Sequence, residues 1–532
     1  MRILISDKFS ESGLAVFQGA ANVEVAYRPG IKGEELLSAI VQADALIVRS
    51  ETKVTTDLLA AAGKLKVIGR AGAGVDNIDL PAASRRGIVV MNTPGGNTVA
   101  TAEHAIALMM SLARRIPQAH AALKAGKWEK SKNMGVELAD KTLGVIGFGN
   151  VGRVVTDRAL GFKMRVLVHD PFVVPDKIIA AGATPVEFDQ LLAESDFITI
   201  HAVKNDKTVN MINAATIAKM KKGVRLINAA RGVLVNEADL LAALQSGQIA
   251  GAAVDVYPVE PCTDSPLFAL DNVVVTPHLG ASTSEAQENV AVAIARQVLE
   301  YLQKGVALNA VNAPYVEPEM AKRMAPVLDL AERLGAVLGQ VIEAAPHTLK
   351  IFFGGDFAAM PSEPLRRAIL VQFLRHLHSE GEVNAINAPY FAEQHGIKIV
   401  ETKRPQLTDY ANVIGVKAVT AKGEHEIQGS IPAPNEPRIV QFNDYRITVE
   451  PEGWLLLMTN KDVPGVVGDV GMTLGRAKVN IGQLRLGRIK GQDHALMVVN
   501  IDSKAPDELV DALRRLPQVL SVKQVYAGDA NQ

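Results

Sequence analysis

A glycine-rich segment in the middle of the chain constrains the fold more than any other stretch of the sequence. It reads Gly147-Phe148-Gly149-Asn150-Val151-Gly152, follows the apolar run 143–146 and precedes a helix-like run that continues to residue 160. Glycines at this spacing let the chain turn tightly, let the backbone approach a pyrophosphate, and leave the N–H groups at the helix start free. The sequence therefore predicts a dinucleotide site at the end of a parallel strand, formed by Gly147, Gly149, Asn150, Val151 and Gly152.

An acidic residue follows at the distance that such a site requires. The next apolar run, 166–168, is followed by His169 and Asp170. A carboxylate at that position accepts hydrogen bonds from both hydroxyl groups of the adenosine ribose, and it repels a 2′-phosphate. No arginine at 171 or 172 compensates for that repulsion. Asp170 therefore favours NAD over NADP as the cofactor.

The first 300 residues alternate between β-branched runs and helix-like segments, which is typical of parallel sheets covered on both faces. The runs form two series: 2–6, 45–48, 65–68 and 88–91, then 142–146, 165–168, 197–201, 224–228, 252–256 and 273–276. One long apolar helix, 97–125, is expected to bridge two lobes, and the helix 282–304 to cross back. We predict an α/β fold with two doubly wound parallel-sheet lobes: 1–96 plus 283–308 for substrate, and 97–282 for NAD.

The C-terminal part of the chain follows a different pattern. A strong helix over about 319–342 is followed by mixed elements and a Pro-rich segment, 430–437, among strand-like runs, which predicts an intervening α+β domain over 309–452. From 453 to 532 the order is strand, helix, hairpin, helix, strand. That order is βαββαβ, the ferredoxin-like arrangement.

Composition excludes several classes of protein. Over 532 residues, 56 Lys and Arg balance 57 Asp and Glu, and no basic stripe is present, so a nucleic-acid partner is not expected. No run of about 18 apolar residues is present, so no membrane span is expected. The single cysteine, Cys262, excludes an internal disulfide, and the N-terminal apolar run is too short for a signal peptide. We expect a cytoplasmic protein without a metal site.

Three segments that follow second-lobe strands contain the side chains needed for alcohol oxidation, and ligands of open α/β sheets bind at such strand ends. His278 is the expected base for the hydroxyl proton, because histidine has an unperturbed pKa of about 6.5. Glu260 is expected to hold the imidazole in one tautomer. Arg231 is expected to bind a substrate carboxylate with two parallel hydrogen bonds.

Together these motifs resemble the D-isomer-specific 2-hydroxyacid dehydrogenase family, and within it the long members that oxidise a phosphorylated substrate. The resemblance covers essentially the whole chain and includes Val48-Arg49-Ser50, the segment 69–77, and Asn92-Thr93-Pro94 with Asn97. It implies NAD-dependent oxidation of 3-phospho-D-glycerate to 3-phosphohydroxypyruvate, the first step of the phosphorylated route to L-serine. It assigns the catalytic roles to Arg231, Glu260 and His278.

The resemblance also implies which residues contact the ligands. Beyond the glycine motif, NAD contacts fall on Asp170, Ala202, Ala229, Ala230, Arg231, Asp255, His278, Gly280 and Ala281. Substrate contacts fall on Arg49, Arg70 and Asn97, and a phosphorylated acid requires such additional arginines because it carries more negative charge. Ala73 and Ala202 stand where many relatives have threonine, so cofactor contacts there rest on backbone atoms.

The last 80 residues resemble an ACT domain, a regulatory module that binds small molecules. The resemblance implies serine as a feedback inhibitor held by Asn460, Asp462 and Asn480. It also implies a homodimer or homotetramer. Two alternatives to the main function stay open: a glyoxylate or hydroxypyruvate reductase, and a non-catalytic NAD-sensing scaffold.

Overall fold

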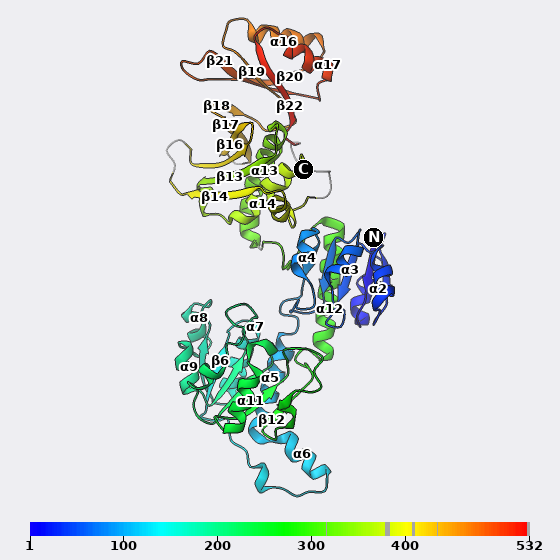
Figure 1. Ribbon diagram of the computed structural model, residues 1–532, viewed down its shortest axis with the longest axis vertical. Helices are drawn as coiled ribbons and strands as arrows, with labels where there is room; N and C mark the ends of the chain where they lie inside the picture. Colours follow the sequence, from blue (N-terminus) through cyan, green and yellow to red (C-terminus); the bar gives the residue numbers. More distant parts are fainter. Residues whose placement is uncertain (315, 378–382, 407–409, 434, 529–532) are drawn as a thin grey trace.

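The computed structural model describes residues 1–314, 316–377, 383–406, 410–433 and 435–528, which form four β-sheets along an elongated molecule (Figure 1). Two parallel-sheet lobes are followed by a mixed sheet and an antiparallel ACT sheet, which confirms the predicted fold class. Residue 434 of the predicted Pro-rich segment and residues 529–532 of the predicted last domain lie outside the described residues.

The first lobe is a five-stranded parallel sheet in the order β2-β1-β3-β4-β5. Its strands are β1 Arg2–Ile5, β2 Glu24–Tyr27, β3 Ala45–Val48, β4 Val67–Arg70 and β5 Val89–Met91, and its helices are α1 Glu11–Ala15, α2 Gly33–Ile40, α3 Thr56–Ala61 and α4 Leu80–Arg85. The sequence did not predict β2. This strand lies at the sheet edge and is only half-buried, so it lacks the continuous apolar run of the inner strands.

The second lobe is a seven-stranded parallel sheet in the order β12-β11-β10-β9-β6-β7-β8. Its strands are β6 Thr142–Ile146, β7 Arg165–His169, β8 Thr184–Pro185, β9 Phe197–Ile200, β10 Val224–Asn228, β11 Ile249–Val254 and β12 Val273–Val275; its helices are α7 Asn150–Gly161, α8 Pro175–Ala180, α9 Phe188–Glu194, α10 Ala214–Ile217 and α11 Glu237–Ser246. The two-residue edge strand β8 was not predicted. The strand order reverses between β6 and β9, and such a switch point opens a crevice for a ligand.

The bridging segment 97–125 is not one helix, which corrects the prediction. It forms α5, Thr98–Arg114, and α6, Ile116–Lys124, because Arg115 adopts the left-handed conformation with φ 50°. The helix α5 packs on the second sheet, whereas α12, Ser284–Lys304, packs on the first sheet through Ile294 and Val298. Residues at the starts of both helices, among them Val99 of α5 and Ala286 of α12, line one pocket.

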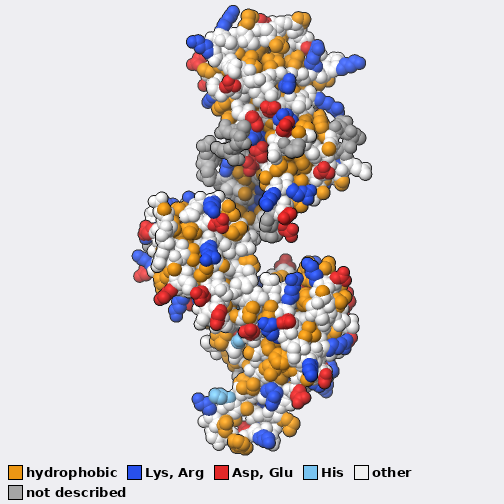
Figure 2. Space-filling view, turned by 180° about the vertical axis from the view of Figure 1, so that it is seen from behind, with side chains coloured by type: hydrophobic (Ala, Val, Ile, Leu, Met, Phe, Trp, Pro, Cys, Tyr) orange, Lys and Arg blue, Asp and Glu red, His pale blue; other side chains and the backbone are white. Residues whose placement is uncertain are grey.

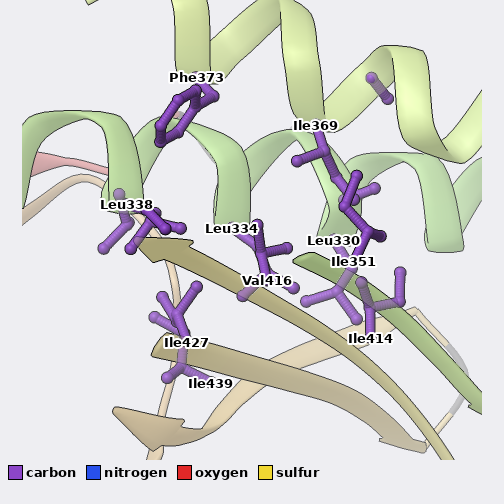
Figure 3. Packing of buried hydrophobic residues seen from close by; sticks show 14 of the residues in the cluster. Leu330, Leu334, Leu338, Ile351, Ile369, Phe373, Ile414, Val416, Ile427 and Ile439 are labelled. Atoms are coloured by element: carbon purple, nitrogen blue, oxygen red, sulfur yellow. The ribbon is translucent and has the colours of Figure 1, made fainter. Parts of the chain in front are cut away.

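The intervening part is a six-stranded sheet in the order β14-β13-β15-β16-β17-β18, covered by helices. Its elements are α13 Pro318–Val341, β13 Pro346–Gly355, α14 Ser362–Arg375, α15 Ala388–Gln394, β14 Lys398–Arg404, β15 Asn412–Thr420, β16 Gly423–Ala433, β17 Glu436–Phe442 and β18 Tyr445–Val449. Figure 3 shows α13 between α14 and the sheet, where Leu334 of α13 lies close to Val416 of β15.

The C-terminal sheet has the order β20-β21-β19-β22 with antiparallel neighbours, which confirms the βαββαβ prediction. Its elements are β19 Trp454–Lys461, α16 Val466–Arg476, β20 Ile481–Arg488, β21 His494–Ile501, α17 Asp507–Arg514 and β22 Val519–Tyr526. One face of this sheet packs on α16 and α17, and the other contributes Leu455, Leu457 and Val498 to the intervening core. Both faces are therefore covered.

Within the described residues, no helix has the length and apolar character needed to cross a membrane. The same part of the chain contains no group of three metal-ligating side chains placed to share an ion. Figure 2 shows basic and acidic side chains interspersed over the visible face, in line with the formal net charge of -1.

Candidate active site

The glycine loop after β6 has the geometry of a pyrophosphate cradle. A Cβ on Gly147, whose φ is 93°, would lie 2.7 Å from the His201 carbonyl oxygen, and one on Gly152 would lie 2.1 Å from the Gly147 carbonyl oxygen. Nothing lies within 4 Å of a Cβ on Gly149, which caps α7 without a side-chain hydrogen bond. The helix start therefore presents free N–H groups to open space, and these residues fit a bound dinucleotide.

Asp170 is fixed next to this loop. Its carboxylate accepts hydrogen bonds from the Phe148 N–H at 2.7 Å and the Phe172 N–H at 2.9 Å, one on each oxygen. An ionised carboxylate has about four lone-pair sites, so both oxygens keep capacity for ribose hydroxyls. Burial lowers the pKa of His201 to about 4, so the imidazole beside the loop is neutral. The site therefore gains no positive charge from His201 to attract a 2′-phosphate.

The remaining predicted cofactor residues lie along one edge of the second sheet. Ala202 follows β9; Ala229, Ala230 and Arg231 follow β10; Asp255 follows β11; and His278, Gly280 and Ala281 follow β12. The carboxyl ends of these four neighbouring strands meet at the same edge. Asn97 caps the start of α5, where the chain passes between the lobes.

Asp255 anchors the loop that carries His278. Its side chain is fully buried, and its carboxylate accepts hydrogen bonds from Thr276 Oγ1 at 2.6 Å, the Leu279 N–H at 2.7 Å and the Gly280 N–H at 2.9 Å. The His104 imidazole lies 3.1 Å from the same carboxylate. Burial disfavours the charged form, but these bonds outweigh it and hold the pKa of Asp255 below its usual value.

His278 and Glu260 form a hydrogen-bonded pair in the loops that follow the neighbouring strands β12 and β11. His278 Nδ1 lies 2.6 Å from Glu260 Oε2, and the other carboxylate oxygen accepts the Tyr257 N–H at 3.0 Å. Burial opposes ionisation of Glu260, but the bonds from His278 and Tyr257 hold the pKa of the carboxyl below its usual value. With Nδ1 donating to Glu260, Nε2 is the nitrogen left to accept a proton. His278 itself has a left-handed φ of 53°.

Arg231 reaches across the cleft to the first lobe. Its Nε donates to Asp76 Oδ2 at 2.8 Å, and its Nη1 donates to the Ala230 carbonyl at 2.7 Å. Asp76 follows β4 of the first sheet, whereas Arg231 follows β10 of the second. Arg231 Nε already donates to Asp76, so it is not available for one of the two predicted hydrogen bonds to a substrate carboxylate.

Arg49 directly follows β3, and Arg70 ends the neighbouring strand β4 of the first lobe. The Arg49 N–H donates to Asp7 at 2.6 Å, and Arg70 Nη1 donates to the Ala71 carbonyl at 3.3 Å, whereas the buried Nε of Arg70 has no hydrogen-bond partner among the described residues. Burial, together with the charges of Arg231 and Arg49, lowers the pKa of Arg70 to about 10. The carboxylates of Asp76 and Asp7 offset part of this repulsion, and an anionic ligand would favour the charged arginines further.

Sequence reasoning missed Asp76, His104 and Thr276. Asp76 stands in the segment 69–77 that carried the family resemblance, but no side-chain role was assigned to it. His104 was considered only as part of an apolar bridging helix, and its spacing from Asp255, 151 positions away, gives no local signal. Contacts between two sheets become visible only when the chain is folded.

Two of the three predicted regulatory residues, Asn460 and Asp462, lie at the end of β19 before α16, whereas Asn480 follows α16 and lies at the opposite end of the sheet, so one chain does not bring the three together. Asn460 is buried, and its Oδ1 has no hydrogen-bond partner in the described part of the chain. Asp462 accepts hydrogen bonds from Arg488, with Nη2 2.6 Å from Oδ2, and Asn480 donates to Asp502 at 2.8 Å. Asp462 and Asn480 therefore already have partners within the same domain, and a ligand there would share or replace them.

Known proteins match the chain along nearly its whole length. The model of the D-isomer specific 2-hydroxyacid dehydrogenase NAD binding domain matches residues 106–280, the D-3-phosphoglycerate dehydrogenase intervening domain 323–443, and the ACT domain 454–518. A D-3-phosphoglycerate dehydrogenase of Synechocystis sp. is 40% identical over 526 residues, covering 99% of this chain and 94% of its own.

Solved structures match the two N-terminal lobes. The cofactor(NAD+)-bound 3-phosphoglycerate dehydrogenase of Entamoeba histolytica is 30% identical and covers 59% of this chain and 99% of its own, with a TM-score of 0.51. A glyoxylate reductase from Paecilomyes thermophila is 30% identical and covers 58% and 98%, with a TM-score of 0.54. The chain belongs to the D-isomer specific 2-hydroxyacid dehydrogenase family, in its D-3-phosphoglycerate dehydrogenase branch, and it carries the NAD-binding domain of that family.

Proposed function

We propose that the chain oxidises 3-phospho-D-glycerate to 3-phosphohydroxypyruvate with NAD. The observation that carries this proposal is the placement of Arg49, Arg70 and Arg231 around the cleft beside the His278–Glu260 pair. A substrate with both a carboxylate and a phosphate neutralises this charge, whereas glyoxylate or hydroxypyruvate offers one carboxylate. The arginine cluster therefore favours the phosphorylated substrate over that of a glyoxylate or hydroxypyruvate reductase.

Each residue of the cleft has a separate role in the proposed reaction. His278 Nε2 takes the proton of the substrate hydroxyl, and Glu260 stabilises the positive charge that the imidazole gains. Arg231 binds the substrate carboxylate and stabilises the oxygen of the keto product in the reverse direction. NAD, held by the glycine loop and Asp170, supplies a hydride acceptor.

The decisive experiment measures NADH formation from 3-phosphoglycerate at alkaline pH with a trap for the keto product. His278→Ala should lower kcat by about 10³-fold while NAD still binds, because proton transfer is lost and the glycine loop is untouched. Wild-type turnover of glyoxylate or hydroxypyruvate alone would establish the reductase instead. NAD binding without turnover of any 2-hydroxy acid would favour the scaffold.

Serine is the proposed effector of the ACT domain. Asn460 supports it, since its buried Oδ1 has no partner, and so does Gly465, which precedes α16 at φ 97° without a side-chain cap. A ligand ammonium can bind the amide oxygen, and its carboxylate can bind the free N–H groups. Serine should inhibit the full chain, and Asn460→Ala should relieve inhibition without changing uninhibited kcat. Inhibition equal in both proteins would contradict this assignment.

We also propose a homodimer or homotetramer. The helix α6 has no buried residue, and Ile116, Leu123, Trp128 and Met134, on and beyond it, are all more than half exposed. Figure 1 shows this segment projecting from the end of the second lobe, where a second copy can cover it. Trp128→Glu should lower the molecular mass measured by light scattering. An unchanged mass would contradict this interface.

The remaining proposals concern organisation and location. The packing of α12 on the first sheet supports a division of the chain into four domains: 1–96 with 283–308, 97–282, 309–452 and 453–532.

We propose a cytoplasmic location because the only cysteine, Cys262, is free and half-buried.

A further inference from the structure

The ion pair between Asp76 and Arg231 crosses the cleft. Asp76 comes from the loop after β4 in the first lobe, and Arg231 from the loop after β10 in the second. The pair is half-open to solvent, with 49% of the Asp76 side chain and 33% of the Arg231 side chain exposed. An ion pair this exposed contributes little to stability, so its effect on the orientation of Arg231 matters more.

Two nitrogens of the Arg231 guanidinium form hydrogen bonds, and the third forms none with the residues that the structure describes. Arg231 Nε donates a hydrogen bond to Asp76, and Nη1 donates one to the Ala230 carbonyl, each with a length of 2.8 Å or less. The third nitrogen, Nη2, lies over Gly74, where an added Cβ would be only 2.1 Å away. Two anchored nitrogens fix the plane of the fork, because a guanidinium is rigid and planar.

We propose that Asp76 is a positioning residue, which holds Arg231 across the cleft so that Nη2 points at the substrate carboxylate over Gly74. The carboxylate of Asp76 serves this role better than an amide would, since only a charged acceptor also offsets the neighbouring arginines. Asp7 cannot replace it, because its oxygens already accept bonds from Arg49 and Thr52.

This inference rests on the proposed reaction and extends it. Asp76→Asn keeps the shape of the side chain but removes its charge, so Arg231 can leave its position. We expect kcat to fall by about tenfold and KM for 3-phosphoglycerate to rise, since small misplacement of a substrate-binding group slows the chemical step. Asp76→Glu, which restores the charge, should recover part of kcat.

Asp57→Asn is the matched control. Asp57 lies exposed in the first turn of α3 in the same lobe and forms no ion pair within the part of the chain that the structure describes, so the variant removes one carboxylate without touching Arg231. Its kcat and KM should equal those of the wild type. NAD affinity and the thermal midpoint of Asp76→Asn should also match the wild type, which a purely structural role would not allow.

Three outcomes would overturn the proposal. A lower KM with unchanged kcat in Asp76→Asn would show that Asp76 competes with the substrate for Arg231. Unchanged kinetics would show that the ion pair is idle, and parallel losses of NAD affinity and thermal midpoint would show a structural role. If wild type turns over another 2-hydroxy acid instead of 3-phosphoglycerate, the proposed function fails, and the Asp76 variants are compared on that acid.

Discussion

The two sides of the cleft differ in how many of their polar groups have hydrogen-bond partners. We call the side formed by Asp255, Glu260 and His278 of the second lobe the cofactor wall, and the side formed by Arg49 and Arg70 of the first lobe the substrate wall. On the cofactor wall, Asp255 has four hydrogen-bond partners and Glu260 is hydrogen-bonded to His278. On the substrate wall, Arg70 has a buried Nε without a partner, and Arg49 adds a second positive charge nearby. We propose that the first wall is preorganised for proton transfer, whereas an anionic substrate supplies further partners for the second.

Of the variants that compare the two walls, Glu260→Gln on the cofactor wall is expected to cause the largest loss of kcat. The amide cannot stabilise a positively charged His278, and it can present an N–H where a carboxylate oxygen now accepts. We expect kcat to fall by about 10²- to 10³-fold in the NADH assay, with NAD affinity unchanged. A loss below tenfold would show that His278 does not depend on this carboxylate.

The glycine loop and the catalytic pair differ in what the sequence could predict. Gly147 to Gly152 were predicted as a local strand–turn–helix signal, because the constraint acts within six residues. The structure brings Glu260 and His278 to 2.6 Å, as their positions after adjacent strands suggest, and their catalytic roles stay predictions. The break at Arg115 was missed because no Gly or Asn marks that left-handed position.

Side chains that contact across the cleft could not be predicted from periodicity. Asp76 and Arg231 are 155 positions apart and lie on different sheets, so neither strand pattern contains information on the other. The edge strand β2 and the short β8 were missed for a different reason, since their burial is partial and their apolar runs are short. Sequence patterns thus define buried, regular elements best.

The proposed role of the substrate wall in binding the phosphorylated substrate is tested by removing the positive charge of Arg70. Arg70→Met keeps most of the apolar volume but loses the guanidinium, so kcat/KM for 3-phosphoglycerate should fall by about 30- to 100-fold. Turnover of an unphosphorylated 2-hydroxy acid should change by less than about fivefold, because that acid needs fewer cationic contacts. Arg86→Met is the control, since Arg86 caps the end of α4 and its guanidinium donates to the Ala62 carbonyl.

Equal losses on both substrates would place Arg70 at the shared carboxylate rather than at the phosphate. The same comparison for Arg49→Met distinguishes the two arginines. The arginine with the larger difference between substrates is the phosphate ligand.

Asp255→Asn tests whether the cofactor wall depends on a charged carboxylate. The folded pKa lies below the unfolded value despite burial, because His104, Thr276 and the Leu279 N–H favour the charged form. The stabilisation is therefore present above the unfolded pKa and is lost as pH falls through the folded one. We expect Asp255→Asn to cost about 2 kcal/mol at pH 7, and less as pH falls below about 4.

Thermal unfolding of both proteins from pH 7 to pH 3 measures this difference. A gap between the wild type and Asp255→Asn that stays constant with pH would mean that the carboxylate charge contributes nothing. Hydrogen exchange at Leu279 and Gly280 gives a local check, because both N–H groups lose a charged acceptor in the variant.

Substitution of His104 is expected to cause the smallest loss of kcat. It tests how strongly the cofactor wall is preorganised. It lies on α5 and contacts Asp255 at 3.1 Å and Thr276 at 3.3 Å, so it reaches the reaction only through the loop that carries His278. His104→Leu should lower kcat by about three- to tenfold, and His104→Gln should restore most of it, since its amide nitrogen can replace Nε2. If both variants lose activity equally, packing at α5 rather than the bond to Asp255 matters. If neither does, the remaining partners of Asp255 are enough to hold the loop, and the cofactor wall is more strongly preorganised than the reaction needs.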